Sequence, residues 1–330
     1  MKRNKVLYIC VILLLLGLIL FALFGGNSAV SAKDVFSVLL GKGSRSAQVI
    51  LLQIRIPRIA AAVFAGAALS VSGYLLQNNL NNMLASPSLL GINSGAGLGV
   101  LLSALIFPYR FGVKCFAAFL GAFLVTLLVY LLSSTTGMSK SSVILSGVAF
   151  SALCSSFINI IISLRPETVA DKAAFQIGGF SALPITVCFW GVPVILAGLL
   201  TALLSAPALD ILLLGDESAK SLGVNVRLYR GIHIMCAALL SGAAVSMCGV
   251  LSFVGLLIPN IVRLFYKGRA RGSVVFSMLF GACFLLLCDT LSKFMAFPYE
   301  LPCGLLISCI GAPFFIGILI KKRKKLGTKE

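Results

Sequence analysis

The chain is short of acidic residues, of histidine and of charge in general. Its 330 residues include 9 acidic side chains and 1 histidine, and charged residues make up 11% of the total. A soluble domain would carry roughly a quarter charged residues. This scarcity, together with a mean hydropathy of +1.08, excludes an ordinary soluble globular protein and indicates a membrane protein.

The sequence also lacks the common catalytic and metal-binding motifs. It contains no H-E-x-x-H and no G-x-x-x-x-G-K-[ST], and its one histidine, His233, leaves no plausible histidine-based triad. None of the 10 cysteines forms a C-x-x-C pair, and almost all lie in apolar runs, where a thiol behaves as a small hydrophobe. We therefore expect no catalytic residue, no metal site and no cofactor in this chain, which is not expected to be an enzyme.

Basic residues, by contrast, are plentiful, with 27 lysines and arginines against 9 acids. In a soluble chain this surplus would suggest nucleic acid, but the positive-inside bias of membrane proteins explains it here. We expect the lipid bilayer as the environment and no nucleic acid as a partner. No long polar block could fold separately, so residues 1–330 are predicted to form a single transmembrane domain.

Apolar runs long enough to cross a bilayer occur along the whole chain. Basic residues precede the first run, 6–24, which is longer than the core of a signal peptide and is predicted to be a span with its N-terminus inside. The mixed segment 32–53 is predicted to lie outside, and 173–184 to lie in the membrane interface. The other predicted spans are two between Arg58 and Arg110, then 115–132, 143–164, 185–206, 231–250, 251–262 (interrupted by Gly255 and Pro259), 273–293 and 303–320.

These runs predict an all-α polytopic membrane protein with about ten transmembrane helices and both termini in the cytoplasm. Gly91, Gly95 and Gly99 repeat at four-residue spacing, which is typical of a face for close helix packing.

A dense group of charges lies between two of the runs, in the segment 209–230. Within it, 216–222 is predicted to be a short helix, with Asp216 and Glu217 in its first turn and an Asp216–Lys220 pair along one face. Gly223 is positioned to end this helix. From the pattern alone, an ordinary solvated loop and a surface held by a partner outside the membrane both remain open.

The outer ends of the predicted spans carry a basic group made of Arg55, Arg58 and Lys293. Snorkelling side chains and an Asp289–Lys293 pair would explain it, and so would a docking surface for an acidic partner outside the cell. Asp289 itself lies in an apolar run, where a carboxylate is costly, so a proton-relay role is a third possibility.

Several short motifs occur in a fixed order from residue 55 to the C-terminus. They are Arg55-Ile-Pro-Arg58 followed by Ala-Gly-Ala-Ala-Leu with Gly73 and Gln77, Ala85-Ser-Pro-Ser-Leu-Leu-Gly91, Leu145-Ser-Gly-Val-Ala-Phe, Leu214-Gly-Asp-Glu-Ser-Ala-Lys-Ser-Leu-Gly-Val, Gly249-Val-Leu-Ser-Phe-Val-Gly-Leu-Leu-Ile-Pro259, Glu300-Leu-Pro-Cys-Gly and Gly311-Ala-Pro-Phe-Phe. Together they resemble the FecCD-type permeases of ABC importers for iron–siderophores, haem and vitamin B12.

The resemblance implies a fold like that of the vitamin B12-importer permease and a location in the bacterial cytoplasmic (inner) membrane. Two copies, as a homodimer or a paralogous heterodimer, would form the pathway. A cytoplasmic ABC ATPase that binds ATP and Mg²⁺ would contact the coupling helix at 215–223. The residues implied in that contact are Gly215, Asp216, Glu217, Ala219, Leu222 and Gly223.

The same resemblance implies that Arg55 and Arg58 meet acidic residues of an extracytoplasmic substrate-binding protein. Lys293 falls where the family usually places a third arginine, and a lysine loses bidentate grip on a carboxylate. A ferric siderophore is the expected substrate, with haem and cobalamin open. The main alternative is a proton-coupled secondary transporter that uses Asp289, and a structural or assembly role is a further one.

Overall fold

The computed structural model describes residues 2–25, 32–107, 110–135, 139–181, 183–295 and 299–326, and every regular element within these ranges is helical. Short 3-10 turns cover Pro87–Leu90 and Pro166–Thr168, and a π-helical turn covers Ile50–Arg55. The α-helices are α1 Lys2–Phe24, α2 Ala32–Leu39, α3 Arg45–Val49, α4 Ile56–Asn79, α5 Ile92–Ile106, α6 Phe111–Thr135, α7 Lys140–Leu164, α8 Val169–Ile177, α9 Ile185–Leu212, α10 Asp216–Ser221, α11 Val226–Cys248, α12 Val254–Phe265, α13 Ala270–Met295 and α14 Cys303–Leu326.

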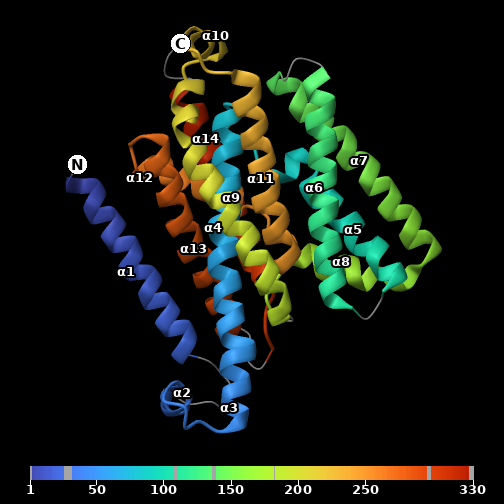
Figure 1. Cartoon of the computed structure of the whole chain (residues 1–330), viewed down its shortest axis with the longest axis vertical. Helices are drawn as coiled ribbons and strands as arrows, with labels where there is room; N and C mark the ends of the chain where they lie inside the picture. The colour runs from blue at the N-terminus through green and yellow to red at the C-terminus, as the bar shows by residue number, and fades with distance from the viewer. Residues whose placement is uncertain are drawn as a thin grey trace.

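Helix α4 lies at the centre, with α9, α11, α12 and α13 packed around it (Figure 1). Alanine, glycine and serine make up 10 of its 24 residues, so neighbouring backbones come very close at these positions. A Cβ atom added at Gly66 would collide with the carbonyl oxygen of Gly281 on α13, and one added at Gly281 would collide with that of Gly66. This packing of small residues, rather than bulky apolar contacts alone, holds the two helices together inside the membrane.

Helices α5 to α8 form a second group beside this centre, joined to it mainly through α6 and α11 (Figure 1). The predicted small-residue face is confirmed on α5. A Cβ atom at Gly95 would meet the backbone of Gly121 on α6, and one at Gly99 would meet that of Ala117. Gly91, at the start of the same face, adopts a φ of +75° as the residue before α5.

The segment predicted as a mixed external stretch is largely helical. Val35 and Val38 of α2 pack on Ala47 and Leu51, and α3 continues through the π-helical turn into α4, giving one helical run of 35 residues from Arg45 to Asn79. The wide turn comes directly before Pro57, which has no amide hydrogen to donate, and Ile56 bonds to Leu51 instead. The scattered charged and polar residues of 32–53 concealed this short amphipathic pattern.

The break expected inside 251–262 lies earlier. Helix α12 runs unbroken through Gly255 and Pro259, and the chain is non-helical between Cys248 and Val254. Pro259 cannot donate to the carbonyl of Gly255, but the side-chain amide of Gln77 on α4 lies 3.5 Å from that oxygen and 3.2 Å from the oxygen of Leu256. The neighbouring helix therefore partly compensates for the missing backbone donor.

Within the described residues, seven helices are long and apolar enough to cross a membrane, and 92–106, 254–265 and 303–317 are shorter apolar helices. These helices correspond to the predicted spans, while the exact number of crossings stays a prediction. Helix α1 begins, and α14 ends, toward the end of the molecule that carries α10 (Figure 1). The cytoplasmic location of both termini also stays a prediction.

Candidate functional site

Helix α10 forms the tip of the molecule, on the connection between α9 and α11 (Figure 1). It is bounded on both sides by glycines with positive φ, Gly215 at +105° and Gly223 at +80°. At its end, Gly223 donates to the oxygen of Lys220 at 2.9 Å and Val224 donates to that of Ala219 at 3.0 Å. This pair of bonds is a Schellman motif, so the predicted helix and its glycine stop are confirmed.

One face of α10 anchors it and the other faces outward. Ala219 is fully buried against Leu212 and Val226, whereas Glu217 and Lys220 are exposed and Leu222 is 62% exposed. Leu213 and Leu214, just before the helix, are exposed as well. Charged and large apolar side chains therefore project together from a fixed short helix, which is a surface suited to a protein partner.

The predicted Asp216–Lys220 pair is replaced by a different one. The carboxylate of Asp216 accepts from Arg230 on α11 at 2.9 and 3.1 Å, and the Arg230 side chain is only 4% exposed. Arg230 is close because the turn after Gly223 reverses the chain and returns α11 beneath α10. Asp216 thus orients the helix, while Glu217 is the acid that is free to face a partner.

A second polar cluster lies at the opposite end. Arg58 on α4 donates through Nε and Nη2 to Asp289 on α13 at 3.0–3.2 Å, and through Nη1 to Glu300 at 2.7 Å. Lys293 lies 3.3 Å from Asp289, which confirms that predicted pair, and Ser181 contacts the Glu300 carboxylate at 3.2 Å. The cluster joins α4, α13, the segment before α14 and the connection after α8.

The structure brings Arg58 and Lys293 together but places Arg55 elsewhere. Arg55 is 7% exposed and donates to the carbonyl of Leu23 at 2.7 Å, next to the end of α1. Arg58 is equally buried, at 6%, and uses all three of its nitrogens within the chain. Any acidic partner would therefore have to compete with carboxylates that already hold Arg58.

These contacts also bear on the proton-relay alternative. Asp289 is 1% exposed and lies between a guanidinium and an ammonium group. Both of its carboxylate oxygens are held by cations of the same chain, whereas a proton carrier must exchange protons along a pathway. Asp289 therefore has the environment of a structural ion pair.

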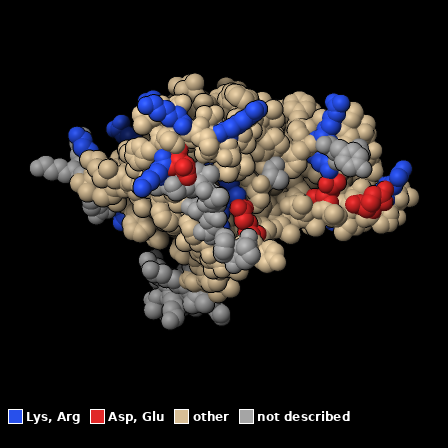
Figure 2. Space-filling view, turned by 90° about the horizontal axis from the view of Figure 1, so that it is seen from below, with Lys and Arg blue, Asp and Glu red and all other residues tan. Residues whose placement is uncertain are grey.

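Glu300 is the member of the cluster that solvent reaches, with 45% of its side chain exposed. Burial raises the pKa of its carboxyl group, but the hydrogen bond and charge of Arg58, with smaller contributions from Ser181 and Lys293, outweigh it and hold the pKa below the ordinary value. Figure 2 views the molecule from the end opposite α10 and shows basic and acidic side chains next to one another at several places.

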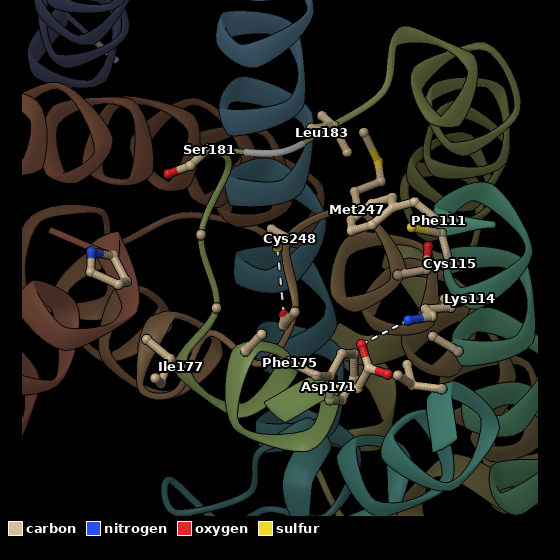
Figure 3. Close-up of a pocket in the computed structure, with 18 residues that line it drawn as sticks. Phe111, Lys114, Cys115, Asp171, Phe175, Ile177, Ser181, Leu183, Met247 and Cys248 are labelled. Atoms are coloured by element: carbon tan, nitrogen blue, oxygen red, sulfur yellow. Dashed lines mark hydrogen bonds and ion pairs between the residues drawn. The ribbon is translucent and has the colours of Figure 1, made fainter. Parts of the chain in front are cut away.

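A cavity of about 320 Å³ lies between α6, α8 and α11. Lys114 and Asp171 point toward each other across it and form an ion pair of 2.7 Å, while Phe175, Met247 and Cys248 supply apolar wall (Figure 3). Helix α8 covers one side of this cavity, in part of the segment predicted to be interfacial.

Several residues that shape these sites escaped the sequence analysis. Arg230 was included in the charged segment 209–230, and Glu300 in the motif Glu300-Leu-Pro-Cys-Gly, but neither was assigned an ion-pair partner. Asp210, whose carboxylate accepts from the amide of Ala270 at 2.9 Å and so caps α13, was counted only among the charges of the segment 209–230. An acid just after an apolar run could have suggested a cap, but the identity of its partner depends on helix packing.

All of these features define a polytopic α-helical membrane protein with a short charged helix, α10, at one end and an ion-pair cluster at the other. The chain belongs to the FecCD transport family, whose sequence profile matches residues 13–321. It is thus a permease subunit of the ABC importer class, a multi-pass inner-membrane protein and not itself an enzyme.

Curated relatives align with most of the chain, and two of them are named for the iron compound that they transport. The Fe(3+)-citrate import system permease protein YfmD of Bacillus subtilis (strain 168) is 36% identical over 98% of this chain and 98% of its own. The hemin transport system permease protein HmuU of Yersinia pestis is 33% identical over 84% of each chain.

A solved structure has the same fold. An ABC transporter assigned to the metal-chelate type, in an inward-facing conformation, superposes with a TM-score of 0.84 at 27% identity, covering 96% of this chain and 99% of the other. The predicted fold class and family are confirmed.

Proposed function

We propose that this chain is the transmembrane permease subunit of a binding-protein-dependent ABC importer for iron(III) chelates, with ferric siderophores as its substrates. The names of the relatives above refer to ferric citrate and hemin, both of which are iron held by an organic ligand. Haem, which is another iron chelate, and cobalamin, which holds cobalt, are the alternative substrates that a transport assay must separate.

The observation that carries the proposal is the geometry of α10. A helix of 6 residues is fixed by a buried alanine, a Schellman motif and an ion pair to Arg230, and it projects Glu217 from the tip of the molecule. Exposed leucines lie directly before and after it. We assign this surface to an ABC ATPase that binds ATP and Mg²⁺ in its own chain. The contact would comprise Gly215, Asp216, Glu217, Leu222 and Gly223. Ala219, which was predicted to belong to it, is fully buried and would instead hold α10 in place from beneath.

A second permease copy is needed to complete the pathway. Only 22% of the apolar window of α7 is buried, yet its exposed side chains include Ser155, Asn159 and Ser163. Hydroxyl and amide groups are unfavourable against lipid, so this face requires another protein surface or a water-filled pathway. A homodimer, or a heterodimer with a paralogue, would supply both.

The outer cluster is the proposed contact for an extracytoplasmic binding protein, through Arg58 and Lys293. Arg55, predicted to act with them, lies apart from the cluster against the end of α1. Carboxylates of the binding protein would approach from the exposed side of Glu300 and compete with it for Arg58. With this cluster closed, and with the overall likeness to an inward-facing transporter, the conformation fits the stage at which the outer side is shut. ATP binding would then displace α10 and change the side that the pathway faces.

Uptake by proteoliposomes tests the proposal. The complex purified with its ATPase would be supplied with ⁵⁵Fe-labelled ferric citrate, a ⁵⁵Fe-labelled ferric siderophore, haemin or cobalamin. We expect uptake of an iron chelate that needs ATP and the binding protein and that persists when a protonophore collapses the proton gradient. Uptake that follows the proton gradient without ATP would overturn the proposal.

A further inference from the structure

The last turn of α4 carries three consecutive polar side chains, Gln77, Asn78 and Asn79, at the end of an otherwise mostly apolar helix. All three are buried, with 1%, 7% and 3% of their surface exposed. Burying three amide groups costs free energy unless each group forms hydrogen bonds. Asn79 bonds to α11, whereas Gln77 and Asn78 bond to α12.

Asn79 connects α4, through Arg230, to helix α10. Its Nδ2 donates to the backbone oxygen of Arg230 at 3.0 Å, and the guanidinium of the same Arg230 holds Asp216 on α10 at 2.9 Å. A displacement of α10 is therefore transmitted to the first turn of α11 and from there to the end of α4. No flexible loop intervenes between these contacts.

Gln77 and Asn78 connect the same turn to α12. The Oδ1 atom of Asn78 accepts from Arg263 at 3.3 Å, and Gln77 donates to the oxygen of Leu256 at 3.2 Å. Asn260, also on α12, donates to the oxygen of Met83, just beyond α4, at 3.2 Å. Helix α12 is thus tied to the end of α4 by three side chains along its length.

Helix α12 is short and has a strained start. Its 12 residues span about 18 Å, and Phe253, immediately before it, adopts a φ of +69°, which is unfavourable for a bulky residue. The non-helical turn before Phe253 is bonded to α8, because Val250 donates to Phe175 at 2.9 Å and Gly179 donates to Cys248 at 2.7 Å. Cys248 and Phe175 line the cavity of Figure 3, so movement of α12 would shift the wall of this cavity next to α8.

The amide network is also incompletely satisfied in this conformation. Among the residues that the structure describes, Oε1 of Gln77 and Oδ1 of Asn79 are buried and have no hydrogen-bond partner. A half-satisfied buried network is unfavourable, and a second arrangement that pairs these oxygens would remove that cost. Two alternative arrangements of one contact set are what a switching element requires.

We propose that Asp216, Arg230, Asn79, Asn78 and Arg263 form a relay that couples the position of α10 to the tilt of α12, with Asn79 as the central positioning residue. This inference rests on the proposed function, because it assumes that an ATPase moves α10. In the nucleotide-free complex the relay holds the present arrangement. When α10 moves, the contacts of Asn79 and Asn78 rearrange, and α12 carries the motion to the turn at 249–253.

Hydrogen exchange of the intact permease–ATPase complex tests the relay. Exchange at 254–265 is compared with and without ATP in the presence of EDTA, which permits binding without hydrolysis. We expect ATP to change exchange there in the wild type, and Asn79→Leu to reduce this ATP-dependent change about fivefold, the factor that corresponds to one hydrogen bond. Arg263→Gln, at the other end of the relay, is expected to act in the same direction.

Ser72→Ala is the matched control. Ser72 also lies on α4 and donates to a backbone oxygen of α11, that of Ala237 at 2.8 Å, but it lies outside the relay. This variant should lose comparable stability and keep the full ATP-dependent change. If Asn79→Leu and Arg263→Gln both retain that change, the relay is wrong while the importer stands. If no ATPase accompanies the wild-type chain, the proposed function fails first, and the relay with it.

Discussion

Arg58 and Asp289 lie 231 positions apart in the sequence and form a buried ion pair, with Nη2 of Arg58 3.0 Å from Oδ1 of Asp289. The pair joins the central helix α4 to α13 at the end opposite α10, and Lys293 and Glu300 extend it. It fixes the outer ends of two helices whose middles are already held by the contact between Gly66 and Gly281.

Removing the charge of Asp289 should therefore destabilise the protein strongly. Asp289→Asn removes the buried one of Arg58's two carboxylate partners and leaves only the half-exposed Glu300, and breaking a buried pair costs about 3–5 kcal/mol. Glu167→Gln is the control, because Glu167 pairs with Arg165 at 3.4 Å while both side chains are 65% exposed, and such pairs contribute about 0–1 kcal/mol. Thermal unfolding in detergent compares the two, and equal losses would contradict a structural role for Asp289.

Acidification should act on the same cluster through Glu300. Because the folded-state pKa of this carboxyl is held below its value of 4.5 in an unfolded chain, its contribution to stability is present above pH 4.5 and is lost as pH falls through the folded-state value. Glu300→Gln should lower the melting temperature at pH 7, and the difference from wild type should shrink below pH 4.5. A difference that stays constant from pH 7 to pH 3.5 would contradict the ion pair with Arg58.

Gly223, which follows α10, allows an effect on protein stability to be distinguished from an effect on the coupling of transport to ATP hydrolysis. Gly223→Ala places a Cβ atom at a φ of +80°, at a cost of roughly 1–2 kcal/mol, and should disturb the end of α10. Gly41→Ala is matched to it, since Gly41 has a φ of +75° and open space around its Cα but lies between α2 and α3. Both variants should lose similar stability, and only Gly223→Ala should lower transport per ATP hydrolysed. Equal transport ratios would show that the shape of α10 does not matter for coupling.

The sequence predicted the helices well because the length and hydrophobicity of each apolar run are enough to indicate a membrane-spanning helix. Helix α10 and its end at Gly223 were readable from local chemistry, as was the glycine face of α5. The ion pairs were not, since Asp216 had Lys220 as its obvious local partner and the turn after Gly223 brings Arg230 closer. Arg58 was likewise grouped with the basic residues at the outer ends of the predicted spans. Its ion pair with Asp289 depends on how α13 packs against α4.

The central claim is that α10 is the contact for an ATPase, and Glu217 is its most accessible acid. The direct measurement is the number of ATPase copies that remain bound to each permease after gentle purification from the native membrane. We predict one ATPase per permease for the wild type and for Glu167→Lys, which reverses an exposed acid elsewhere. For Glu217→Lys we predict at least a tenfold weaker association, as expected when a central charge at an interface is reversed. An undiminished ratio for Glu217→Lys, with normal ATP-driven uptake, would contradict the account.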